Sequence, residues 1–173
     1  EGISETDIWE CIASLEKIFK VDPARKYLSG HSMGGYGAWT ISMKSVNTWA
    51  ALGIRAGALW YDPEVMNDEV FETLKDIPVY FVVGNMDGLY SINFSAYQNL
   101  LAAGNENTEF VTFDGGHESL AANVEDMYLW IKNFTNDDWN MSSDKPGVVH
   151  SLHQSVNCFP NPVRDNALLI CQL

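Results

Sequence analysis

The sequence has no long hydrophobic run, and this limits where the chain can lie. No stretch of about eighteen apolar residues occurs, so we expect no membrane-spanning helix. A leader with a basic start and a short apolar core is also missing, and the first residue is Glu1 rather than Met. We therefore interpret the chain as a fragment or a processed product.

Basic residues and cysteines are both scarce. Ten Lys and Arg stand against 23 Asp and Glu, which gives a net charge of −13. Such a charge repels phosphates and anionic lipid headgroups, so we expect no nucleic-acid partner and no anionic membrane surface. Cys11, Cys158 and Cys171 lack the spacing of a metal site, and their odd number leaves the redox compartment open.

The residues that are present predict one domain with a parallel sheet. The 173 residues are 46% hydrophobic, which suffices for a sizeable core. Apolar runs predict strands at 26–29, 50–54, 77–84 and 108–113, and "DPAR" before the first of them predicts a turn. Apolar residues at helical spacing predict helices at 4–20, up to about 45, 64–75, 91–103 and 121–134. Strands that alternate with helices predict an α/β fold with three layers, α/β/α.

The stretch "LSGHSMGGYGAW", residues 28–39, holds the strongest chemical signal. Gly30, Ser32 and Gly34 fit the pattern G-x-S-x-G of a nucleophile elbow, and a predicted strand precedes it while a predicted helix follows. Both glycines are needed because the strand and the helix approach closely at such a turn. The amide of Met33, at the start of the helix, would then point at an oxyanion. The alternative is a glycine-rich turn with an incidental serine.

A serine nucleophile needs a base, and the sequence offers four histidines. His117 follows the last predicted core strand in "FDGGHESL", at the same sheet edge as the elbow, so we predict that it is the base. The alternative for His117 is a solvated loop residue. His31 lies inside the elbow and is expected to pack beside the turn, whereas His150 and His153 lie in the tail.

A carboxylate must orient the base, and Asp87 is the preferred candidate. It stands just past the apolar strand 77–84, and the order Ser32, Asp87, His117 is the order of an α/β-hydrolase. Asp114 is the rival, but it follows the same strand as His117 and is expected to shape that loop. Asp62 in "WYDPE" is expected to be a turn former.

These motifs together resemble the α/β-hydrolase superfamily. "VDPARKYLSGHSMGGYGAW" is most similar to the elbow of its esterase and prolyl-oligopeptidase-like branch, "IPVYFVVGNMDGLY" to the acid loop and "DGGHE" to the histidine loop. The resemblance covers about residues 4–134 and implies Ser32 as nucleophile, His117 as general base and acid, and Asp87 as the orienting carboxylate. No cofactor or metal is implied.

The chain departs from the family in length. Family members have about eight strands, and only four are predicted here. The missing first half, with the second oxyanion donor, should lie upstream of Glu1. We therefore expect the C-terminal half of a larger enzyme, with an exposed sheet edge and poor activity alone.

The residues after about 135 have a different character. Residues 136–157 are polar turn formers and predict a linker after a hydrolase portion at 1–135. "FPNPVRDNALLI" resembles the start of the C-terminal sorting domain of the type IX secretion system, so residues 158–173 are interpreted as a truncated sorting domain. The resemblance implies secretion or display at the cell surface, with the secretion machinery as a partner of the C-terminal tail. The alternative is a proline-rich terminus without function.

The expected function is a serine hydrolase that cleaves a small-molecule or polysaccharide-linked carboxylic ester through an acyl-enzyme. The alternatives are a prolyl-oligopeptidase-like serine peptidase and a non-catalytic surface binding module with a hydrolase fold. Trp39, Trp60 and Tyr61 are candidates for lining a substrate pocket, although core packing is the commoner role of such residues.

Overall fold

The computed structural model describes residues 3–58, 68–137, 158–161 and 167–172. The α-helices are α1 (Ile3–Ile18), α2 (Met33–Lys44), α3 (Asp68–Leu74), α4 (Tyr90–Ala102) and α5 (Ala121–Ile131). The strands are β1 (Val21–His31), β2 (Ala51–Arg55), β3 (Val79–Gly84), β4 (Thr108–Phe113), β5 (Cys158–Asn161) and β6 (Ala167–Gln172). The predicted residues Trp60, Tyr61, Asp62, His150 and His153 lie outside the described residues, as do most of the linker and the first residues of the helix predicted at 64–75.

The predicted parallel sheet is confirmed for β1 to β4. Within the described residues, six strands form one sheet in the order β4-β3-β2-β1-β6-β5. Strands β1 to β4 are parallel neighbours, as crossover connections through helices require. Every residue of β2 and β3 is buried, which explains why both strands read as continuous apolar runs.

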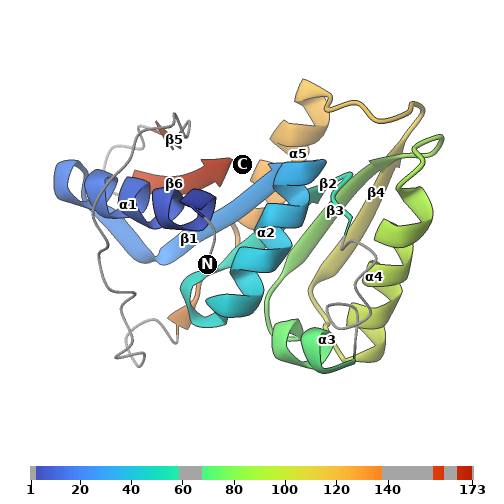
Figure 1. The fold of residues 1–173 in the computed structure, drawn as a ribbon, viewed down its shortest axis with the longest axis horizontal. Helices are drawn as coiled ribbons and strands as arrows, with labels where there is room; N and C mark the ends of the chain where they lie inside the picture. The colour runs from blue at the N-terminus through green and yellow to red at the C-terminus, as the bar shows by residue number, and fades with distance from the viewer. Residues whose placement is uncertain (1–2, 59–67, 138–157, 162–166, 173) are drawn as a thin grey trace.

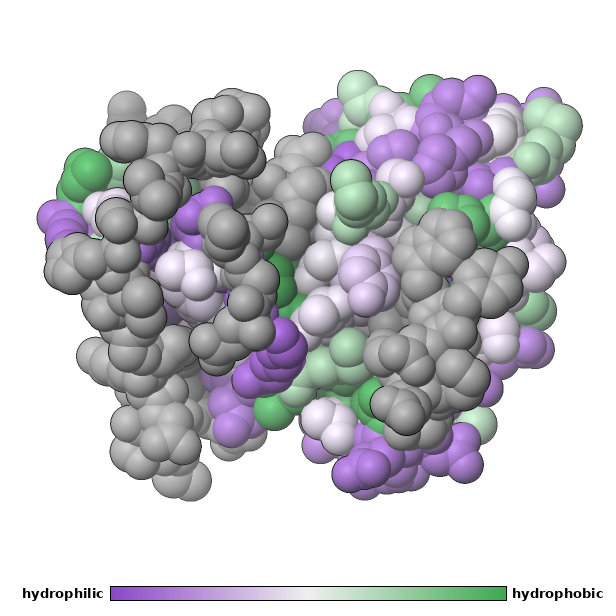
Figure 2. Space-filling model, viewed as in Figure 1, coloured by the Kyte–Doolittle hydropathy of each residue, from purple (hydrophilic) through white to green (hydrophobic). Residues whose placement is uncertain are grey.

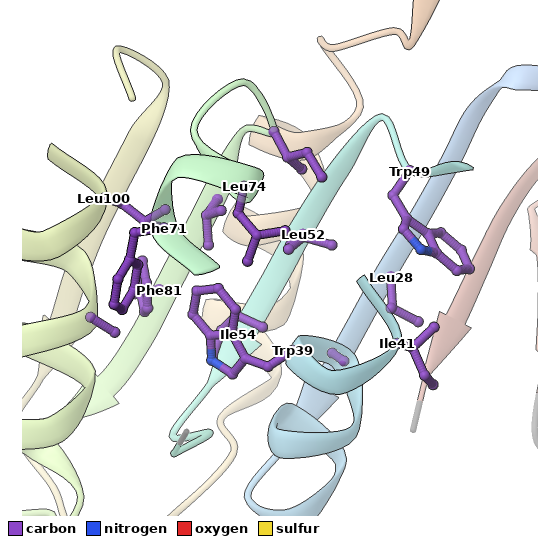
Figure 3. Packing of buried hydrophobic residues seen from close by; sticks show 14 of the residues in the cluster. Leu28, Trp39, Ile41, Trp49, Leu52, Ile54, Phe71, Leu74, Phe81 and Leu100 are labelled. Atoms are coloured by element: carbon purple, nitrogen blue, oxygen red, sulfur yellow. The ribbon is translucent and has the colours of Figure 1, made fainter. Parts of the chain in front are cut away.

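Helices cover both faces of this sheet, so the chain has three layers, α/β/α. In Figure 1, α1 and α2 lie in front of the sheet and α5 lies behind it. The described residues form two hydrophobic clusters, and Figure 3 shows part of the larger one. This cluster packs α1, α2, α3 and α4 against one face of the sheet; its members include Leu28, Trp39, Leu52, Phe71 and Phe81. Trp39 is fully buried there. The second cluster joins the other face to α5 through Met127 and Ile131.

The surface seen in Figure 2 carries mostly hydrophilic residues on its coloured part, with hydrophobic residues in separate spots. Scattered exposed apolar residues of this kind are ordinary for a folded domain. No helix in the described ranges is long and apolar enough to cross a membrane.

The start of β1 differs from the prediction. "DPAR" was expected to turn the chain, but it lies inside β1. The carboxylate of Asp22 accepts a hydrogen bond from the amide of Ala24 at 3.0 Å, which is a local turn within an extended segment. The register of β1 against β6 shifts in the same segment, between Val21 and Lys26. The turn chemistry is therefore real, but it makes an irregularity in a strand and does not end one.

The sequence predicted an exposed sheet edge, but the edge of β1 that faces away from β2 is paired. Strand β6 pairs with β1 in parallel, from Val21 opposite Ala167 to Ser29 opposite Gln172. Strand β5 pairs with β6 in the antiparallel direction and so lies outermost. The backbone hydrogen bonds of that edge of β1 are thereby used within the chain. The division into a hydrolase portion, a linker and a truncated sorting domain stays a prediction.

Candidate active site

Ser32 lies between the last residue of β1 and the first residue of α2. Its backbone has φ 56° and ψ −115°, a conformation that non-glycine residues rarely adopt. Such a conformation costs about 1–3 kcal/mol and persists only where the surrounding structure enforces it. The amide of Ser32 donates to the carbonyl of Arg55 at 2.9 Å, which ties the turn to the end of β2. The hydroxyl is thus held at one rim of the sheet.

Glycines allow the strand and the helix to meet at this turn. A Cβ on Gly30 would lie 2.1 Å from the carbonyl carbon and oxygen of Gly34. A Cβ on Gly35 would lie 2.6 Å from the Cα of Gly57, because α2 also passes close to the chain after β2. Real Cβ atoms do not approach backbone this closely, so side chains at Gly30 and Gly35 would push α2 off the sheet.

His117 stands in the loop after β4, and the structure brings it to Ser32. Its Nε2 lies 2.7 Å from Ser32 Oγ. Its Nδ1 lies 2.8 Å from Asp87 Oδ2. Because an ionised carboxylate only accepts, the Nδ1–H donates to Asp87, and Nε2 is left to accept from the serine hydroxyl. The three candidates taken from the sequence therefore form one continuous chain of hydrogen bonds.

Asp87 is fixed on both of its carboxylate oxygens. Its side chain is 1% exposed, and Oδ1 accepts from the amide of Leu89 at 2.8 Å while Oδ2 faces His117. The rival Asp114 lies elsewhere: its Oδ1 accepts from the side chain of Asn85 at 3.3 Å. Asp114 thus connects the loops after β3 and β4, in keeping with the loop-shaping role expected for it.

The loops that carry Asp87 and His117 are packed directly on each other. A Cβ on Gly84 would lie 2.2 Å from the carbonyl oxygen of Gly116. The amide of Met86 donates to the carbonyl of Gly115 at 2.9 Å. This close backbone contact fixes the distance between the carboxylate and the imidazole, because neither loop can move without the other.

His31 packs beside the turn, as the sequence indicated. Its ring lies 5.0 Å from the ring of His117, centroid to centroid, at a tilt of 38°. Burial lowers the pKa of His31, and the nearby His117 and Arg55 lower it further, while Asp87 and the backbone of Glu118 act in the opposite direction. A neutral imidazole is therefore favoured at this position.

Arg55, the last residue of β2, was not among the site residues that the sequence predicted. Its side chain is buried, with the whole residue 3% exposed, and Nη1 donates to Ser119 Oγ at 2.7 Å. One signal was available, because "ALGIR" ends a fully buried apolar strand on a charge. Charged side chains are almost never fully buried unless they are paired.

Two further candidates concern the oxyanion and the substrate pocket. Met33 is the first residue of α2, where helix amides have no partner within the helix and the helix dipole favours negative charge.

The part of the chain that the structure describes contains no group of three or more His, Cys, Asp or Glu side chains that could hold a metal ion. Trp39 is fully buried in the hydrophobic core.

Comparisons with known proteins find similar folds among solved structures only. No protein-family model matches the chain, and no curated protein matches it either. Among solved structures, a thermostable esterase is similar over 75% of this chain and 36% of its own, with 20% identity and a TM-score of 0.61. A ferulic acid esterase is similar over 72% of this chain and 58% of its own, with 20% identity and a TM-score of 0.59.

A third similar structure is the S-formylglutathione hydrolase FrmB from Staphylococcus aureus, which matches over 72% of this chain and 59% of its own, with 20% identity and a TM-score of 0.55. This chain thus spans from about a third to three fifths of the length of these structures. Identities this low establish the fold alone. The chain has part of the α/β-hydrolase fold, and its structure is similar to those of esterases.

Proposed function

We propose that this chain carries the catalytic centre of a serine hydrolase that cleaves carboxylic esters through an acyl-enzyme. The observation that carries the proposal is the hydrogen-bond chain from Ser32 through His117 to Asp87, with 2.7 Å and 2.8 Å between the paired atoms. This is the geometry of an activated serine: a nucleophile bonded to a base that a buried carboxylate orients.

The first half of the reaction acylates Ser32. Its Oγ attacks the ester carbonyl carbon while His117 Nε2 takes the hydroxyl proton, and the carbonyl electron pair moves onto oxygen. The amide of Met33 at the start of α2 donates to that oxyanion. The tetrahedral intermediate then collapses, the bond from carbon to the alcohol oxygen breaks, and His117 returns the proton to the leaving alcohol.

The second half hydrolyses the acyl-enzyme. Water attacks the acyl carbon while His117 Nε2 takes one of its protons, and collapse then expels Ser32 Oγ, which recovers that proton. Asp87 stays ionised throughout and stabilises the imidazolium, since its carboxylate accepts from His117 Nδ1–H at 2.8 Å.

The strained backbone of Ser32 supports the same proposal. Residues held in sparsely populated conformations cluster at functional sites, and this one holds a hydroxyl against an imidazole. A binding module without catalysis would have no use for such strain or for a buried carboxylate behind the histidine. Ester substrates are favoured because the similar structures include a thermostable esterase and a ferulic acid esterase.

The test is hydrolysis of p-nitrophenyl acetate by the intact protein, beside Ser32→Ala as the matched inactive variant. We expect a burst of p-nitrophenol from the acyl-enzyme in the parent protein and none in Ser32→Ala. A proline-containing anilide assayed in parallel separates an esterase from a peptidase. Turnover that survives Ser32→Ala would refute the proposal, and turnover of the anilide alone would favour the peptidase.

We also propose that the protein is secreted or displayed at the cell surface. The support is the resemblance of "FPNPVRDNALLI" to the start of a type IX sorting domain. Removal of the residues from 158 onward in the native host should then retain the protein inside the cell. Unchanged export of the shortened protein would refute this localisation.

A further inference from the structure

Two side chains at the carboxyl ends of β1 and β2, the half-buried His31 and the buried Arg55, contact the loop that carries His117. His31 and Arg55 are the last residues of these strands and stand directly opposite each other in the parallel register. Two and four residues earlier, on the same face of β1, Ser29 contacts Met127 of α5 and Tyr27 donates to the carbonyl of Phe134, just after α5. His31 and Arg55 therefore project toward the α5 side of the sheet, where the histidine loop runs into α5.

Arg55 contacts this loop directly, at a residue that follows His117 in the sequence. Its Nη1 donates to Ser119 Oγ at 2.7 Å, two residues past the histidine. His31 contacts the loop as well: its ring packs against the ring of His117 at 5.0 Å, and the backbone of Glu118 interacts with it. Three consecutive loop residues thus each meet one of these two side chains.

The other end of the loop is held separately. The amide of Gly115 donates to Asn85 Oδ1 at 3.3 Å, and the carbonyl of Gly115 accepts from the amide of Met86 at 2.9 Å. These contacts precede His117, whereas the Arg55 contact follows it. The loop is therefore held on both sides of His117, by residues just after β3 and by the last residue of β2.

The energetics set Arg55 apart from an ordinary core residue. Its Nε and Nη2 are buried without a hydrogen-bond partner, and none of the salt bridges formed by the described residues includes it. A buried guanidinium in this state costs free energy that a neutral side chain would not. Departures from good packing rules of this kind concentrate at functional sites.

We propose that Arg55, together with His31, is a positioning residue for His117: its hydrogen bond to Ser119 fixes the outgoing side of the loop so that Nε2 stays within reach of Ser32. The effect that we expect on the reaction rate rests on the proposed function, whereas the effect on the position of the His117 ring does not. Displacement of a catalytic group by about 1 Å can cost about 10²-fold in rate, so a single anchor is enough to matter.

The test compares four variants of the intact protein. Ser119→Ala removes the acceptor and leaves the buried charge in place, Arg55→Met removes the charge and keeps the aliphatic stem, and Arg55→Lys keeps a charged donor. Ser14→Ala is the matched control, because Ser14 also makes a 2.7 Å hydrogen bond, to the carbonyl of Glu10, but lies in α1 away from the loop.

Two measurements are made on each variant. The first is kcat and KM for p-nitrophenyl acetate, where we expect Ser119→Ala to lower kcat about tenfold and Arg55→Met up to about 100-fold, with KM changed less than about twofold. Arg55→Lys should recover most of the loss, and Ser14→Ala should change neither constant. The second is the low-field proton resonance of the His117 Nδ1–H bonded to Asp87, which should broaden or vanish in Ser119→Ala although the melting temperature is unchanged.

The outcomes separate this inference from the proposed function. If the parent protein hydrolyses no ester, the proposed function fails, and the proton resonance alone still decides the positioning role. If Ser119→Ala keeps the parental kcat and a sharp resonance, the positioning role is refuted. If Arg55→Met does not fold, Ser119→Ala decides, since it leaves Arg55 in place.

Discussion

Gly30 offers a sharp test of how the elbow is built, because an added methyl group there has nowhere to go. In Gly30→Ala, the new Cβ would start 2.1 Å from the carbonyl carbon and oxygen of Gly34 and 2.6 Å from the nitrogen of Gly35. All three are backbone atoms of the first turn of α2. No change of side-chain rotamer can relieve these contacts, so α2 itself must move.

The size of the effect follows from these distances. Non-bonded carbon atoms are comfortable at about 3.5 Å, so the first turn of α2 must retreat by about 1.4 Å, the difference between 3.5 Å and 2.1 Å. Overpacking a rigid site typically costs about 1–3 kcal/mol. Because backbone must yield here, we expect about 3 kcal/mol, roughly a 100-fold loss in the ratio of folded to unfolded protein. Ser32 moves with the helix, so kcat for an aryl ester should fall about 10²-fold.

Urea unfolding followed by circular dichroism measures the free energy of unfolding, and Gly88→Ala is the matched control. A Cβ on Gly88 would meet nothing within 4 Å, so this variant should stay within about 1 kcal/mol of the parent. The reasoning would be refuted by a Gly30→Ala protein that unfolds at the parental urea concentration and turns over ester at the parental rate.

Three further predictions concern the charges around the sheet. Asp87→Asn should lower kcat by about 10⁴-fold with little change in melting temperature, because an amide leaves the imidazole in the wrong tautomer. Steady-state kinetics and a thermal melt measure the two quantities, and retained activity would contradict the prediction. Glu16→Gln should lower the free energy of unfolding by about 1 kcal/mol, since it replaces the carboxylate 2.5 Å from the Lys26 ammonium by a neutral amide. The effect is small because Glu16 is 40% exposed and water already screens the pair, and urea melts measure the difference. The pKa of His31 lies below its ordinary 6.5, so the unfolded chain binds more protons and the free energy of unfolding should fall as the pH drops below about 6.5. In His31→Gln, the free energy of unfolding from urea melts should depend less steeply on pH between about pH 5 and pH 7.5. His117, Arg55 and Asp87, which surround His31, are unchanged in this variant. An unchanged pH dependence would show that the pKa of His31 is not lowered in the folded protein.

Much of the fold was predictable because buried parallel strands and amphipathic helices differ in pattern. The strand at 108–113 has the predicted bounds, and Gly104, with φ 92°, ends α4 as a helix C-terminal glycine does. "DPAR" was misjudged, because an Asx turn of the same composition can sit inside a strand. The pairing of β6 with β1 was also not predicted, since the sequence of residues 167–172 does not specify which distant strand this segment pairs with.

The candidate site also has features that the sequence predicts and features that it does not. Ser32, Asp87 and His117 were predictable because each follows a strand, and the carboxyl ends of parallel strands meet at one edge of a sheet. The distances between them were not, because they depend on how Gly84 lets the histidine loop approach. Arg55 escaped prediction because its contact with Ser119 spans 64 residues of sequence and leaves no local pattern.

Covalent labelling of the intact protein with a fluorophosphonate, followed by peptide mass spectrometry, tests the central claim most directly. An activated hydroxyl at Ser32, 2.7 Å from His117 Nε2, predicts one phosphonyl group on the peptide that contains Ser32 and loss of that label in His117→Gln. Labelling at another residue, or equal labelling of Ser32 in His117→Gln, would contradict the account.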